Sequence, residues 1–141
     1  MPSLLPQLIS AAVLIVALAI IHGAGVAAIA HGLGLDRERA KVRRLHPRTV
    51  AILSAVSLLL FALHVIEIAL FAFFYLAVGA ASDLASALYV SAAAYSTLGH
   101  PEMTFPPEWQ VLSALEGVAG FLMLGWSTAF FVTDMNKLLR P

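Results

Sequence analysis

The chain has 141 residues, of which 61% are hydrophobic and 11% charged, and its mean hydropathy is +0.93. A soluble domain of this size needs charged side chains over its surface, whereas long apolar runs with charges at their ends are typical of a polytopic membrane protein. The zero net charge predicts no attraction to nucleic acid, and the absence of cysteine excludes disulfides, thiol redox chemistry and cysteine-ligated metals.

The chain begins with a long apolar span, a basic loop and a second long apolar span. The spans cover residues 4–31 and 49–78. Each is longer than the helix of about 20 residues that is needed to cross a bilayer. Six of the eight Lys and Arg residues lie between Arg37 and Arg48, within the loop 36–48. We therefore expect a multi-pass protein of the cell (inner) membrane. Because basic loops stay in the cytoplasm, its N-terminus is expected on the outer side of that membrane.

Residues 82–96 form a different kind of segment. Ser82 and Asp83 give a helix-start signal, and the apolar run after them is too short to span a bilayer, as in a re-entrant half-helix. The third span, 110–136, then leads back to a cytoplasmic C-terminus that carries Lys137 and Arg140. We therefore expect one all-α membrane domain over 1–141, with three transmembrane helices and a re-entrant half-helix.

Four stretches add a family resemblance to this layout. They are "LHVIEIALFAFFY" (63–75), "YSTLGHPE" (95–102), "PPEWQVLSALEGVAG" (106–120) and "GWSTAFF" (125–131). Together with the half-helix, they resemble the pore module of potassium channels, in the form of small bacterial three-helix proteins. In that family the backbone carbonyls of a T-x-G-Y-G-D loop replace the hydration shell of the ion. The resemblance covers the chain from about Ile21 onward.

The resemblance implies a homotetramer in the lipid bilayer that binds K⁺ or Na⁺ and needs no other cofactor. It assigns residues 97–102 to a filter-like loop in which Glu102 lies at the outer mouth. The ion-filter residues are Thr97, Leu98, Gly99, His100 and Pro101.

Two of these residues depart from the family pattern. Pro101 has φ fixed near about −65° where the family has glycine, and His100 replaces an aromatic residue that packs behind the filter. We therefore expect a degenerate filter and poorly selective or weak passive transport of monovalent cations. The alternative is a non-conducting channel-fold protein whose loop binds a divalent ion or a partner. No nucleophile–base pair is evident, so an enzyme is not expected.

Four ionisable residues lie away from the ends of the apolar spans, where each costs roughly 2–3 kcal/mol or more on insertion: His22, His64, Glu67 and Glu116. His64 and Glu67 share one helix face, and His22 could meet them across the bundle. They could form a metal or proton site, but no firm metal site is predicted. We favour hydrogen bonding that fixes one helix on the next, and expect Glu116 to contact the half-helix through Tyr89, Ser91 or backbone groups.

The last helix carries small and hydroxylated residues that have two interpretations each. Gly117, Gly120 and Gly125 could allow close helix packing or provide a gating hinge. Ser127 and Thr128 could line a water-filled cavity, or bond back to their own helix.

Overall fold

The computed structural model describes residues 4–34, 47–99 and 105–139. These residues form helices, and no strand occurs among them. The helices are α1 (Leu4–Gly32), α2 (Pro47–Ala77), α3 (Leu84–Tyr95), the 3-10 turn η1 (Pro107–Trp109) and α4 (Gln110–Leu139). The all-α prediction is confirmed for the described chain. The expectation of three helices long and apolar enough to cross a membrane is confirmed as well.

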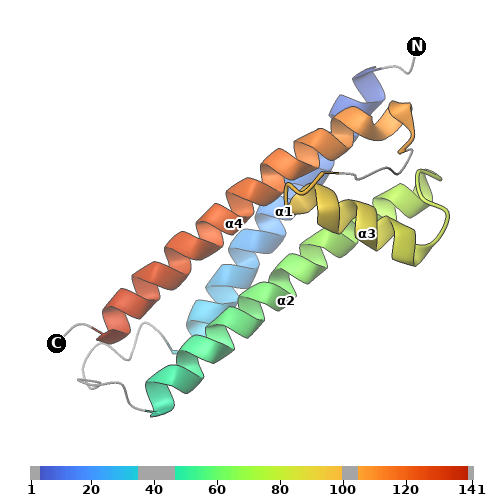
Figure 1. Cartoon of the computed structure of the whole chain (residues 1–141). Helices are drawn as coiled ribbons and strands as arrows, with labels where there is room; N and C mark the ends of the chain where they lie inside the picture. Colours follow the sequence, from blue (N-terminus) through green and yellow to red (C-terminus); the bar gives the residue numbers. More distant parts are fainter. Residues whose placement is uncertain (1–3, 35–46, 100–104, 140–141) are drawn as a thin grey trace.

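The three long helices lie along one another, and α3 packs across α2 and α4 near the end where α1 and α4 begin (Figure 1). Helix α4 ends and α2 begins at the opposite end of the bundle. Apolar side chains also cover the outside: Leu58 is 70% exposed and Phe61 69%. Helices that are apolar on all sides are typical of a membrane environment, where the outer face needs no charge.

The start of α3 is set by Asp83. Its carboxylate accepts hydrogen bonds from the backbone N–H of Ser86 at 2.9 Å and from the Ser86 hydroxyl at 2.8 Å, while Ser82 donates a third at 2.9 Å. This is an N-cap that satisfies a first-turn amide. These hydrogen bonds, led by the Ser86 amide, lower the pKa of Asp83 to about 2 because they favour its charged form.

Helix α3 crosses α4 at two glycines. A Cβ atom at Gly117 would lie 3.0 Å from the Ala94 carbonyl oxygen, and one at Gly120 would lie 2.8 Å from Tyr95 Cγ. A Cβ at Gly125, in contrast, would meet nothing within 4 Å. Gly117 and Gly120 therefore allow the two backbones to approach closely, as small residues do between membrane helices.

A side chain from α1 caps the start of α4. Gln7 is only 3% exposed, and its Oε1 accepts a hydrogen bond from the backbone N–H of Val111 at 3.0 Å. The first amides of a helix have no acceptor within the helix. Gln7 supplies one of the missing acceptors, which links the first turns of α1 and α4.

Candidate functional site

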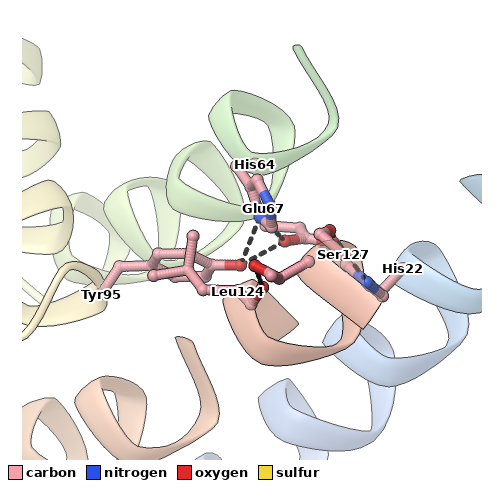
Figure 2. A network of polar contacts seen from close by, with 7 residues as sticks. His22, His64, Glu67, Tyr95, Leu124 and Ser127 are labelled. Atoms are coloured by element: carbon pink, nitrogen blue, oxygen red, sulfur yellow. Dashed lines mark hydrogen bonds and ion pairs between the residues drawn. The ribbon is translucent and has the colours of Figure 1, made fainter. Parts of the chain in front are cut away.

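A buried polar network lies where all four α-helices meet (Figure 2). It contains His22 from α1, His64 and Glu67 from α2, Tyr95 from α3 and Ser127 from α4. His22 and Glu67 are fully buried. The structure thus brings together three of the four ionisable residues that the sequence places away from the ends of the spans.

The Glu67 carboxylate is the centre of this network. Its Oε1 lies 2.8 Å from His22 Nδ1, and its Oε2 lies 3.0 Å from His64 Nδ1. The Tyr95 hydroxyl donates a hydrogen bond to the same Oε2 and lies 2.9 Å from His64 Nδ1. Helices α1, α2 and α3 therefore each contribute a polar side chain within hydrogen-bond distance of this carboxylate, which is itself on α2.

Helix α4 contributes contacts on the far side of His22. The Oγ of Ser127 lies 3.5 Å from His22 Nε2, and the Trp126 ring packs on the His22 ring with their centroids 5.1 Å apart. The two histidine rings lie 5.6 Å apart. These contacts orient His22 so that its Nδ1 faces Glu67 and its Nε2 faces α4.

A groove between α2 and α4 reaches the network from the side. Its volume is about 300 Å³, and its lining includes His64 and Ser127 together with Ser57 and Thr128. The Thr128 hydroxyl bonds back to the Leu124 carbonyl oxygen at 2.8 Å, which agrees with the second of its two sequence interpretations. Ser127 instead is buried against His22.

The second buried carboxylate, Glu116, also contacts α3. Its Oε2 accepts a hydrogen bond from the Tyr75 hydroxyl at 2.5 Å, and its Oε1 lies 2.5 Å from Ser91 Oγ. Ser91 is one of the partners considered from the sequence, whereas Tyr89 is 51% exposed. Glu116 thus connects α2, α3 and α4.

The turn that follows α3 has an unusual backbone. Thr97 has φ 61° and Gly99 has φ 80°, and Thr97 is the only non-glycine residue with positive φ in the described part of the chain. Leu98 between them is 83% exposed. The other predicted filter and outer-mouth residues, His100, Pro101 and Glu102, lie outside the described residues, as do residues 36–46 of the basic loop.

A second groove of about 510 Å³ opens beside this turn. Thr97 and Gly99 line one side of it, and α4 lines the other with Ala114, Val118 and Phe121. The lining of this groove is mainly apolar, and Thr97 and Gly99 of the turn border it.

Tyr95 and Tyr75, which donate hydrogen bonds to the two buried carboxylates, and Trp126, whose ring packs on His22, are contact residues that sequence reasoning missed. Tyrosine and tryptophan in apolar spans have one polar atom each, and that atom usually finds a partner when it is buried. This signal was present in the sequence, but it does not identify the partner.

Comparisons with known protein families, curated proteins and solved structures found no match for this chain. The resemblance to potassium channels therefore stays a prediction that rests on the sequence motifs.

Proposed function

We propose that the protein is a passive pore for monovalent cations, assembled as a homotetramer in the cell membrane. In this proposal α3 is a re-entrant half-helix, and the carbonyl oxygens of Thr97 and Leu98 face the four-fold axis. The N-terminus lies outside and the C-terminus in the cytoplasm. The observation that supports this function best is the backbone of the turn after α3.

Thr97 adopts a left-handed conformation that disfavours a β-branched side chain. Such a residue costs about 1–2 kcal/mol relative to glycine, which is the usual residue just after a helix. Strained backbone of this kind is concentrated at functional sites. The chain therefore retains a threonine, with its hydroxyl and carbonyl, at a position where glycine would be more stable.

The conformations of residues 97–99 suit cation binding. Thr97 and Gly99 have positive φ and Leu98 does not, and alternation of this kind turns successive carbonyl groups toward one side of the chain. Rings of such carbonyls replace the water around an ion in a filter. The C-terminal end of α3, which carries partial negative charge, precedes this turn and favours a cation in front of it.

Four copies are needed to close such a ring, because one turn offers only a few oxygens. The groove beside the turn has an apolar wall on α4 that includes Val118 and Phe121, which are 59% and 65% exposed. These residues supply the apolar surface that a neighbouring copy would bury. Since Pro101 and His100 replace the residues that build the outer sites of the family filter, we expect little discrimination between K⁺ and Na⁺.

Flux through reconstituted protein tests this function. The purified chain is placed in liposomes, and K⁺ and Na⁺ flux are measured under an imposed gradient. We expect comparable flux of the two ions, a clear loss of flux in Thr97→Ala, and unchanged flux in the control Thr133→Ala, whose hydroxyl bonds to its own helix at the Ala129 carbonyl. Absence of both fluxes from a tetrameric preparation would refute the pore and favour the non-conducting alternative.

A further inference from the structure

We infer that His22, His64 and Glu67 form a binding site for a divalent transition-metal ion of the zinc type. One potential ligand atom from each residue lies within 4.8 Å of the other two. The residues come from two different helices and converge only in the folded bundle. This inference does not depend on the proposed pore, because it concerns a site that can bind metal whether or not the protein conducts.

The distances from the two histidines to the carboxylate are somewhat shorter than the ligand–ligand distances around a bound metal. Zinc holds nitrogen and oxygen ligands at about 2.0–2.2 Å, so neighbouring ligands of a tetrahedral site lie roughly 3.3–3.6 Å apart. In the structure, Glu67 Oε1 lies 2.8 Å from His22 Nδ1, and Glu67 Oε2 lies 3.0 Å from His64 Nδ1. Small outward shifts of the two rings would therefore make room for the ion.

The protons in the network also favour a cation. His64 Nδ1, the Tyr95 hydroxyl oxygen and Glu67 Oε2 lie within hydrogen-bond distance of one another. A neutral imidazole and a phenol bring only one proton each to these three contacts, so one proton must be shared. A metal ion in place of the imidazole proton would instead meet the lone pairs of His64 and Glu67, and the Tyr95 hydroxyl would keep its hydrogen bond to the carboxylate as an outer partner.

The charge of Glu67 leads to the same conclusion. No Lys or Arg occurs between Arg48 and Lys137, so no permanent positive side chain within α3 or the core of α2 and α4 can balance this buried carboxylate. A buried carboxylate without a permanent counter-charge is costly inside a membrane bundle, and its two histidine partners carry positive charge only when they are protonated. A divalent cation held by two neutral histidines supplies the missing positive charge.

The ligand types narrow the choice of metal. Two imidazole nitrogens and one carboxylate oxygen suit zinc, iron, nickel or copper better than calcium or magnesium, which prefer oxygen ligands. The contact between Ser127 Oγ and His22 Nε2 is of the kind that orients a metal-binding histidine from its other nitrogen. His64 is 13% exposed and lines the groove between α2 and α4, which offers an access path for the ion.

Hydrogen bonding without metal is the competing explanation, and asparagine variants separate the two. In His22→Asn and His64→Asn the side-chain amide places an N–H donor near the position of Nδ1, so the hydrogen bond to Glu67 is kept. The amide nitrogen has no lone pair for a metal. A structural role would therefore tolerate both variants, whereas a metal site would lose a ligand in each.

Zinc binding to the full-length chain tests the inference. The tag-free protein in detergent is treated with a chelator and dialysed, then titrated with Zn²⁺ by calorimetry, and its bound metal is measured by mass spectrometry. We expect about one zinc ion per chain and a loss of affinity on the order of 100-fold in His22→Asn and His64→Asn. Tyr95→Phe should lose roughly 10-fold, as outer partners of a metal site do.

The control is His31→Asn, which removes an exposed histidine from the same helix as His22. It should bind zinc like the original protein. The thermal unfolding midpoint of each variant is recorded without metal to verify folding. Failure of the folded original protein to bind zinc, or an equal loss of affinity in His31→Asn, would overturn the inference and leave a hydrogen-bonded network. Because no flux enters these measurements, a negative result here is distinct from failure of the pore proposal.

Discussion

The substitution Gly120→Ala tests whether the α3–α4 contact depends on direct backbone approach. The new methyl group would lie 2.8 Å from Tyr95 Cγ and 2.9 Å from Tyr95 Cα, well inside the about 3.5–4.0 Å of an optimal carbon–carbon contact. The Cα atom belongs to the backbone and cannot rotate away. Helix α3 must therefore move away from α4, which also displaces the Tyr95 hydroxyl from Glu67.

The magnitude follows from a comparison with Gly125→Ala, whose methyl group meets nothing within 4 Å. Both substitutions gain the helix propensity of alanine over glycine, about 1 kcal/mol at most, and this gain cancels in the difference between them. The overpacking at Gly120 remains, and such overpacking costs about 1–3 kcal/mol. We therefore expect Gly120→Ala to be less stable than Gly125→Ala by that amount.

Unfolding in mixed micelles with increasing dodecyl sulfate measures this difference, with far-ultraviolet circular dichroism as the signal. Gly125→Ala should unfold at the same or a higher detergent fraction than the original protein, and Gly120→Ala at a lower one. Equal stability of the two variants would show that α3 and α4 do not approach closely at this position. In that case the glycines would have to be interpreted as hinge residues.

Three further outcomes are expected. Thr97→Gly relieves the strain of the left-handed backbone and should raise the free energy of unfolding by about 1 kcal/mol. Cation flux should fall because the hydroxyl is lost. Unchanged stability would show that the turn is not strained. The pKa of Asp83 is lowered from 3.8 to about 2 on folding, so its ionised form stabilises the folded state at pH values above 3.8, and this stabilisation is lost as the pH falls through about 2. Asp83→Asn should remove this part of the acid sensitivity measured by pH-dependent unfolding. Tyr75→Phe removes a donor from the buried Glu116 and should cost about 1–3 kcal/mol, and a double-mutant cycle with Glu116→Gln should show coupling between the two positions.

The long helices were predictable because the signal for them is local. A run of apolar residues longer than the bilayer is visible without knowledge of any neighbour, and so is the shorter run before Tyr95. The contact between His64 and Glu67 is equally local, since residues three apart face the same side of a helix. Backbone periodicity alone therefore placed two residues of the network, His64 and Glu67, on one face.

The remaining contacts depend on how the helices are rotated and crossed, which no single span specifies. His22 faces Glu67 rather than the outside because of the packing of α1 on α2, and Tyr95 reaches the same carboxylate only because α3 crosses at the level of Glu67. The rotation of α4 likewise decides that Ser127 is buried while Thr128 bonds to its own helix. For His22, Ser127 and Thr128 the sequence identified a polar group that needs a partner, and tertiary packing selected the partner.

The two carboxylates that hold α3 restrict how the protein can move. Glu116 on α4 holds Ser91, and Glu67 on α2 holds Tyr95 one helical turn later. Helix α3 is held at two points on one face, so it can rotate about the line that joins them but cannot tilt. The close contact at Gly120 opposes this rotation. Slow amide hydrogen exchange is therefore expected throughout the second half of α3, and faster exchange near the start of α2 and the end of α4. Any large displacement of the long helices is thus confined to the end of the bundle farthest from α3.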